Sequence, residues 1–466
     1  MMGNRMDLTK GPITKVLVQM ALPIMGTAFI QMAYNMIDML FIGRVGSQAV
    51  AAVGTAGYYT WLAMAFVMVS KIGAEIKVAQ SMGAGELSKT KSVIVSALQL
   101  NLVFAFIYGL VGYFGRHQMI GFFNLTDPVV IEQALTYLIV MVMGIGFIFV
   151  NPVFTAIFNG AGDSKTPFII NTIGLVFNIV FDPLLIFGIG PFPALGVLGA
   201  ALATIMAQLL VTICFLVVII RSKSEFLKFN VLRRPDMPMV RDICKLGIPG
   251  ALSSGLFTLF SAALGRIIAG YGATPIAVQK VGSQIEAISW MTAGGFSTAL
   301  GAFVGQNYGA RQYERIEKGF FATLRLAGYL GLFATVLLIF FGRPIFAIFL
   351  PEADAIDQGD VYLKILGVSQ LFMCVEITIQ GLFNGLGRTY IPSIIGIVFT
   401  GARIPMAYVL AQPHVLGING VWWAITISSI IKGTLMLIIY FTLKRRQTLF
   451  LKRDEVLGET LTETIA

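Results

Sequence analysis

Residues 157–167 read IFNGAGDSKTP, and residues 382–392 read LFNGLGRTYIP. The two segments lie 225 positions apart and share an Asn-Gly-x-Gly core and a closing proline. Self-similarity at a fixed spacing indicates an internal duplication, which decides the architecture of the whole chain. This pair of segments therefore predicts a protein built from two halves of the same design.

Other segments repeat in the same order. A shift of 226 positions pairs Pro23 in ALPIMG (21–26) with Pro249 in GIPGAL (247–252), and it pairs VAQSMGAGE (78–86) with VGQNYGARQ (304–312). A shift of 221 positions pairs GVLGAALA (196–203) with GINGVWWA (417–424). We therefore predict four parts, which are an N-lobe (1–222), a basic loop (223–242), a C-lobe (243–445) and a tail (446–466).

Each half consists mainly of long apolar runs. Of the 466 residues, 57% are hydrophobic and only 12% are charged, about half the charged share of a soluble domain. A run of about 20 apolar residues crosses a bilayer, and in lipid a helix satisfies its own backbone groups. The sequence thus predicts an all-α polytopic membrane protein with six helices in each half. The twelve expected spans are 14–42, 50–80, 92–115, 134–158, 166–189, 195–220, 243–270, 276–306, 317–342, 361–384, 391–411 and 417–443.

The loops that join these runs carry the basic residues unevenly. Of the 33 Lys and Arg residues, 23 lie in the N-terminal segment, the even-numbered loops and the C-terminal segment, and seven of these fall within 221–245. The odd-numbered loops hold three, namely Arg44, Arg116 and Arg343. An excess of positive loops marks the cytoplasmic side, so both termini are expected there. The net charge of +10 then reports membrane orientation, and we expect no nucleic-acid partner.

Acidic residues within the apolar runs are the strongest sign of function. In QMAYNMIDMLFIGRVG (31–46), the side chains of Gln31, Tyr34, Asn35 and Asp38 share one helical face. A carboxylate in the middle of a bilayer costs about 2.5 kcal/mol or more, so it is expected to be paired, hydrated or protonated, and to serve the function. Pro23, earlier in the same helix, is expected to bend it.

A second cluster lies in NTIGLVFNIVFDPLLIFG (171–188). Asn178 and Asp182 are four residues apart and therefore share a face, and Thr204 lies in the following span. Two carboxylates, an amide and a hydroxyl form a site for a proton or for a small hard cation such as Na⁺, which prefers oxygen ligands. The alternative is a polar network that only holds the helices together.

The C-lobe has its own buried charges, including Glu286 and Arg403. A salt-bridge network and a contact with the transported substrate are both consistent with them. Motifs for chemistry are absent from the sequence, which has no GxxxxGK[ST], no HExxH and no CxxC among its three cysteines. We therefore expect neither an enzyme nor a resident cofactor.

Taken together, the motifs resemble the multidrug and toxic compound extrusion (MATE) family, in particular its DinF-like prokaryotic branch. The segments that carry the resemblance are LPIMGTAFIQMAYNMIDMLFIGRVG, FNGAGDSKTP, FNIVFDP, GAALAT and FNGLGRT. The resemblance covers residues 10 to 445. It implies two six-helix lobes around a central cavity in the prokaryotic inner membrane, and export of organic, often cationic or amphipathic, compounds driven by H⁺ or Na⁺.

The resemblance also assigns residues. It places the coupling cation at Asp38, Asn178, Asp182 and Thr204, with Gln31, Tyr34 and Asn35 nearby and the bend of the first helix at Pro23. The NorM branch uses an acid early in its seventh helix, but the matching stretch here, ALSSGLFTLFSAALG (251–265), has none. This difference favours a cation site in the N-lobe over one in the C-lobe. A monomer is expected. The alternatives to a cation-coupled exporter are a flippase for a lipid-linked sugar and, from another class of protein, a channel.

Overall fold

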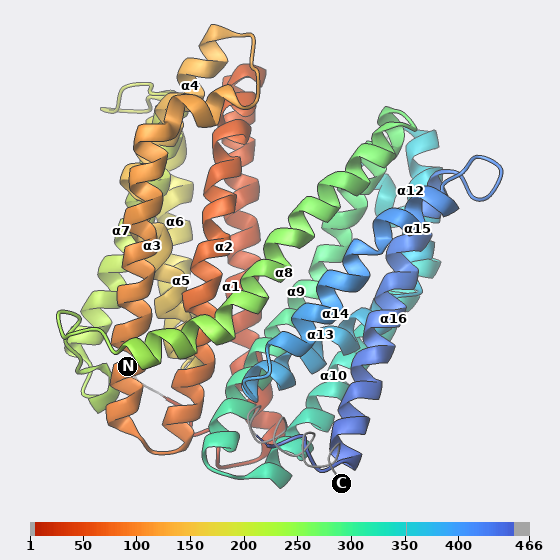
Figure 1. The fold of residues 1–466 in the computed structure, drawn as a ribbon. Helices are drawn as coiled ribbons and strands as arrows, with labels where there is room; N and C mark the ends of the chain where they lie inside the picture. Colours follow the sequence, from red (N-terminus) through yellow and green to blue (C-terminus); the bar gives the residue numbers. More distant parts are fainter. Residues whose placement is uncertain (1–4, 351, 452–466) are drawn as a thin grey trace. The chain divides into compact units, whose positions relative to one another are not determined.

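The computed structural model describes residues 5–350 and 352–451. Within these ranges the chain forms helices, turns and loops with no β-strand (Figure 1). The all-helical class predicted from the sequence is therefore confirmed. Most of the tail predicted at 446–466 lies outside the described residues.

The helices follow the apolar runs of the sequence. Their bounds are α1 (Ile13–Val45), α2 (Ser47–Gly83), α3 (Leu87–Gly121), α4 (Pro128–Met143), α5 (Ile145–Gly160), α6 (Lys165–Phe187), α7 (Val197–Arg221), the 3₁₀ turn η1 (Glu225–Leu227), α8 (Met237–Ala269), α9 (Ala273–Gly309), α10 (Tyr313–Phe340), α11 (Gly342–Ala347), α12 (Ala353–Gly367), α13 (Gln370–Gly385), α14 (Tyr390–Gly401), α15 (Arg403–Leu410) and α16 (Ile418–Arg445).

Most of these helices are long and apolar enough to cross a membrane. Among the described residues nine spans meet that test, with α14 and α15 counted together, and eleven do so if each of two bent pairs is one span. The pairs are α4 with α5, bent by 51°, and α12 with α13, bent by 49°. The remaining expected span, 50–80, coincides with α2, a 37-residue helix. Each of the twelve predicted ranges thus falls on helical residues.

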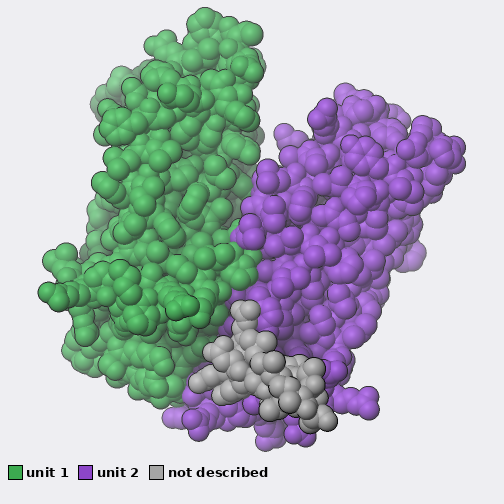
Figure 2. All heavy atoms as spheres, viewed as in Figure 1, with its two compact units in different colours: residues 1–7, 22–251 green, residues 8–21, 252–466 purple. Residues whose placement is uncertain are grey.

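The chain divides into two compact units (Figure 2). Unit 1 comprises the chain up to Asp7 together with Leu22–Ala251, and unit 2 comprises Leu8–Ala21 together with the chain from Leu252 onward. The boundaries fall inside α1 and α8, and the loop 223–242 belongs to unit 1. The lobes predicted from the repeat follow sequence similarity, whereas these units follow packing, so the beginning of each of these two helices groups with the other half of the chain.

Hydrogen bonds explain why residues 8–21 group with unit 2. The Leu8 N–H donates to Gln306 Oε1 over 3.3 Å, and Asn307 Nδ2 donates to the Leu8 carbonyl over 3.1 Å. The Arg315 guanidinium donates to three carbonyls of this segment, those of Leu8, Lys10 and Gly11. The Leu8 side chain is fully buried. The segment before α1 is therefore anchored on α9 and α10.

The basic loop 223–242 is fixed to unit 1 in a comparable way. Phe226 is buried, and Gln99 Nε2 on α3 donates to two carbonyls of the loop over 2.7 Å each. Lys77 on α2 forms an ion pair of 2.6 Å with Asp242 on α8. Lys228 beside Glu225 holds the pKa of that carboxyl below its usual range. The loop thus packs as part of unit 1, and it leads into α8, which contacts α2 through the ion pair of Lys77 and Asp242.

Glycines at repeat-related positions permit two close helix contacts. A Cβ on Gly199 in α7 would lie 2.3 Å from the Leu185 carbonyl oxygen of α6, and a Cβ on Gly420 in α16 would lie 2.1 Å from the Leu410 carbonyl oxygen of α15. Both distances are far below van der Waals contact, and backbone atoms cannot move aside as a flexible side chain can. The duplicated motif therefore places one tight glycine contact in each unit.

We predict that Gly199→Ala and Gly420→Ala each lower the free energy of unfolding by about 1–3 kcal/mol, because the added methyl group overpacks the contact. Gly57→Ala in α2 is the control, since a Cβ there meets nothing within 4 Å. That change is expected to stabilise the helix by up to about 1 kcal/mol. Thermal unfolding of the detergent-purified protein measures the three values. Equal effects at all three positions would contradict the close contacts.

Candidate functional site

The α6 cluster predicted from the sequence lies in the interior of unit 1. Asn178 and Asp182 have no exposed surface, and Asn178 Nδ2 donates to Asp182 Oδ1 over 2.9 Å. Their spacing of four residues places both side chains on the same face of α6. Pro183 follows inside the helix and removes one backbone hydrogen bond of the turn. Asp182 Oδ2 and Asn178 Oδ1 are both buried, with no hydrogen-bond partner in the described ranges.

Helix α1 supplies the second carboxylate. Asp38 interacts electrostatically with Asp182, and the Tyr34 hydroxyl, one turn earlier, interacts with both acids. The Tyr34 hydroxyl also lies beside Thr204 of α7, without the geometry of a full hydrogen bond. Gly26 explains how α1 approaches α6, because a Cβ there would lie 2.5 Å from the Phe168 ring. The structure therefore brings together Tyr34, Asp38, Asn178, Asp182 and Thr204.

Tyr137 of α4 also belongs to this cluster, although it was not predicted from the sequence. Its side chain is buried, and it interacts electrostatically with Asp38, Tyr34 and Asp182. One signal was available, since Tyr137 is the only tyrosine in the apolar helix Pro128–Met143. A buried tyrosine hydroxyl normally has a hydrogen-bonding partner, so this tyrosine indicates other polar groups inside the bundle.

The remaining predicted residues of α1 lie around the cluster. Gln31 is exposed on one side, and together with Tyr34 it lines a small pocket between α1, α6 and α7. Asn35 is exposed, one turn before Asp38. Pro23 lies inside α1, two residues after the position at which this helix passes from unit 2 to unit 1.

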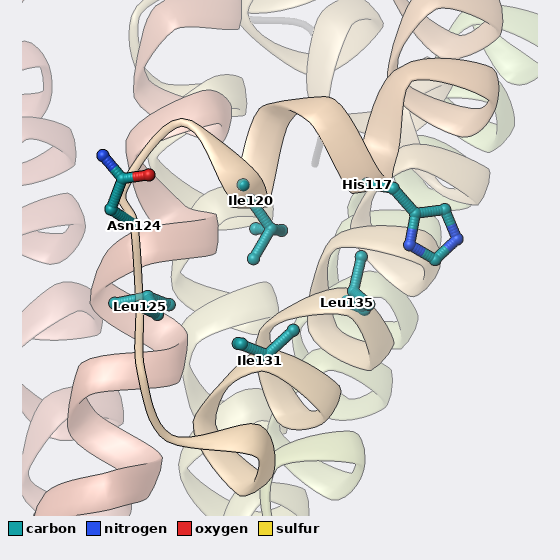
Figure 3. A pocket seen from close by; sticks show the side chains of 7 residues that line it. His117, Ile120, Asn124, Leu125, Ile131 and Leu135 are labelled. Carbon is teal, nitrogen blue, oxygen red and sulfur yellow. The ribbon is translucent and has the colours of Figure 1, made fainter.

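A larger pocket of unit 1 is less suited to ion chemistry. It has a volume of about 210 Å³ and lies between the end of α3, the following loop and α4. Figure 3 shows Ile120, Leu125, Ile131 and Leu135 around it, with His117 and Asn124 at opposite sides. No carboxylate lines this pocket, so the polar cluster between α1, α4, α6 and α7 is the better candidate site.

Unit 2 holds a different set of buried charges. Lys432 on α16 and Glu376 on α13 form an ion pair of 2.9 Å, with side chains 10% and 16% exposed. Arg403 on α15 is buried and donates to the hydroxyl groups of Ser428 and Ser429, over 2.6 and 3.1 Å. Glu376 therefore has a basic residue in direct contact with it.

Glu286 on α9 completes the network. Its carboxylate lies beside Tyr362 and Gln370 and interacts electrostatically with Arg403. Arg403 also interacts with Glu376. Glu376 and Lys432 form an ion pair, and Arg403 interacts electrostatically with both Glu376 and Glu286, so the two acids and the two basic residues lie in one network. A role of Glu286 or Arg403 in substrate binding stays a prediction.

Comparisons with known proteins identify the family. The family model described as MatE matches residues 23–184 and 249–409, which together are more than half of the chain. The chain belongs to the MatE family. The family predicted from the sequence is thus confirmed, and the two matched ranges follow the two halves of the repeat.

Individual relatives agree with this MatE assignment over nearly the whole chain. A probable multidrug resistance protein NorM of Thermotoga maritima is 28% identical over 95% of this chain and 96% of its own length. A probable multidrug resistance protein YoeA of Bacillus subtilis is 26% identical over 86% of this chain and 87% of its own. A solved outward-facing MATE transporter of the MOP superfamily aligns with a TM-score of 0.85 at 22% identity, over 97% of this chain and 99% of its own.

As a MatE protein, the chain is a multi-pass membrane transporter and not an enzyme. Its polar cluster suits the capture of a small cation. The donors are carboxylate, amide and hydroxyl oxygens, which suit hard cations or a proton rather than a soft metal. No group of three His, Cys, Asp or Glu side chains that could hold a metal ion occurs in the part of the chain that the structure describes.

The ion pair of unit 2 gives a stability prediction. We expect Lys432→Met to lower the free energy of unfolding by about 3–5 kcal/mol, because it leaves Glu376 as a buried charge without its partner. The double variant Lys432→Met with Glu376→Met is expected to recover most of the loss. Thermal unfolding in detergent measures both, and a single variant as stable as the parent protein would contradict the buried pair.

Proposed function

We propose that this MatE transporter exports small organic compounds, cationic or amphipathic in character, in exchange for H⁺ or Na⁺. The names of the curated relatives support multidrug export. The coupling cation binds at Asp38, Asn178, Asp182 and Thr204 in unit 1. The proposal includes no prosthetic group, and the H⁺ or Na⁺ is a substrate of the exchange.

A single contrast between the units carries this proposal. In unit 2, Glu376 is paired with Lys432 and Glu286 lies near Arg403. In unit 1, Asp38 and Asp182 act on each other, and no Lys or Arg contributes to their electrostatics within the described chain. Asp182 is fully buried and Asp38 is partly buried, and two like charges in such a place are unfavourable without a counter-charge. A mobile cation is the neutralising charge that such a site requires.

Coupling requires that the cation and the exported compound oppose each other. A ligand shifts the protein between two states only through its different affinities for them. Binding of the cation removes the repulsion between Asp38 and Asp182 and lets α1 pack differently against α6. Pro23 gives α1 a weakened hydrogen-bond ladder where the helix passes from one unit to the other, and this is where we expect it to bend.

The orientation follows from the loop charges. The basic loops face the cytoplasm of a prokaryotic cell, both termini lie on that side, and the protein acts in the inner membrane. A single chain carries both halves of the duplicated fold, so we propose that the monomer is the working unit.

Transport into reconstituted vesicles tests the function. A fluorescent organic cation is supplied while a pH gradient and a Na⁺ gradient are imposed separately, and saturable uptake driven by one of them is the expected result. Uptake of a lipid-linked sugar in place of the organic cation would support a flippase, and flux that does not saturate would support a channel. Either result would overturn the exchange mechanism.

We predict that Asp38→Asn reduces gradient-driven uptake by about tenfold or more, because the amide cannot be neutralised and charged again during the cycle. Glu225→Gln is the control, since this acid lies in the loop 223–242 and outside the site. The amount of protein in the vesicles is measured in parallel. Uptake by Asp38→Asn at the rate of the parent protein would exclude this residue from coupling.

A further inference from the structure

The small pocket beside the candidate cation site has a polar wall. It occupies about 20 Å³ between α1, α6 and α7, enough for one water molecule. Its polar lining comes from Gln31, Tyr34, Asn171 and Gln208. Tyr34 is shared with the cation cluster, and its hydroxyl is buried with no full hydrogen bond in the described residues. A water molecule needs two to four polar partners, and this pocket provides them.

A hydrogen-bonded group continues from the pocket into the bundle. Asn151 Nδ2 on α5 donates to Gln208 Oε1 over 2.8 Å and to the Gln208 carbonyl over 2.9 Å. Thr212, one turn further along α7, donates to Asn151 Oδ1 over 2.8 Å. Asn151 and Thr212 are only 4% and 9% exposed. Two buried polar side chains, Asn151 and Thr212, are thus linked by hydrogen bonds to Gln208 in the wall of the pocket.

The polar positions form two helical stripes. On α7, Thr204, Gln208 and Thr212 follow at intervals of four residues, and the eight residues from first to last rise about 12 Å. On α5, Asn151, Thr155 and Asn159 have the same interval and end beside Gly160, the last residue of the helix. Asn159 Oδ1 is buried, with no hydrogen-bond partner among the described residues. The α7 stripe begins at Thr204 in the cation cluster, and hydrogen bonds of Asn151 join it to the α5 stripe, which ends at Gly160, five residues before Lys165.

We propose that this column is the internal path by which the coupling cation passes between its site and the cytoplasmic end of unit 1. Gln208, Asn151 and Thr212 position the waters that accompany the cation. The inference rests on the proposed function, because it takes the cluster of Asp38 and Asp182 as the start of the path. The proposal gives unit 1 a second role, because its column of polar side chains would connect the cation site to the cytoplasmic side of the membrane.

The alternative is a set of amides that only joins helices. The pair formed by Ser70 and Asn101 shows what that looks like, since Ser70 Oγ donates to Asn101 Oδ1 over 2.8 Å between α2 and α3. Neither residue lines a described pocket next to the cation cluster. Asn101 is fully buried, so Asn101→Leu is a matched control for Asn151→Leu.

The test separates binding from passage. In detergent both ends of the path are open to solvent, so displacement of a bound fluorescent organic cation by H⁺ or Na⁺ reports only the site. In vesicles the cation must cross. We expect Gln208→Leu and Asn151→Leu to displace the probe as the parent protein does, and to lower gradient-driven uptake by about tenfold. Asn101→Leu is expected to keep both properties. Gln208→Met, of similar shape, replaces Gln208→Leu if that variant does not fold.

The outcomes distinguish the two proposals. Loss of displacement in Asp38→Asn together with slow uptake in the column variants supports both the site and the path. Loss of displacement in Asp38→Asn with uptake at the parental rate in Gln208→Leu and Asn151→Leu overturns the path and leaves the site. Unchanged displacement in Asp38→Asn overturns the site. Equal slowing in Asn101→Leu would show that the amides serve only the packing of the bundle.

Discussion

The most demanding feature of this structure is the pair of carboxylates of Asp38, which is partly buried, and Asp182, which is fully buried, since no Lys or Arg among the described residues contributes to their electrostatics. Asp38 on α1 and Asp182 on α6 interact electrostatically, and Asn178 donates a hydrogen bond to one oxygen of Asp182. Two such carboxylates are unfavourable unless they are protonated or bind a cation. The local sequence places Asn178 and Asp182 on one face of α6, and a proline lies in each of the two helices that carry the acids.

The two halves of the duplication have kept their packing and changed their charges. The glycine contacts at Gly199 and Gly420 occupy equivalent positions and bring equivalent helices together. The acids do not correspond, since unit 2 balances Glu376 with Lys432 on a neighbouring helix. Packing depends on small residues at fixed spacings, so it survives divergence, whereas a single substitution creates or removes a counter-charge. This difference explains how one design can provide the proposed cation site in one half and a buried ion pair in the other.

The sequence was sufficient where periodicity and charge act locally. Asn178 and Asp182 could be placed together because a spacing of four defines a helical face, and the cost of a buried acid brought Asp38 to the same site. Tyr137 and the contact of Asn151 with Gln208 could not be placed, because they join helices whose rotation depends on tertiary packing. The division of the chain inside α1 escaped prediction for a similar reason. It depends on Gln306, Asn307 and Arg315 holding Leu8, contacts that lie about 300 positions away in sequence.

Because of the same anchoring, α1 belongs to both units of the chain. Its first turns belong to unit 2, and the remainder, which carries Tyr34 and Asp38, belongs to unit 1. Helix α8 shows the related arrangement, with Pro249 just before the boundary at Ala251 and a Gly247 that leaves no room for a Cβ against the Val69 carbonyl of α2. A helix tied to both units transmits a change at one end only if it can bend between them. Proline removes one backbone hydrogen bond at that point and makes such bending less costly. Asp38 and Pro23 lie on one helix, so the proposed mechanism needs only α1 to connect neutralisation of the carboxylate with bending at the proline.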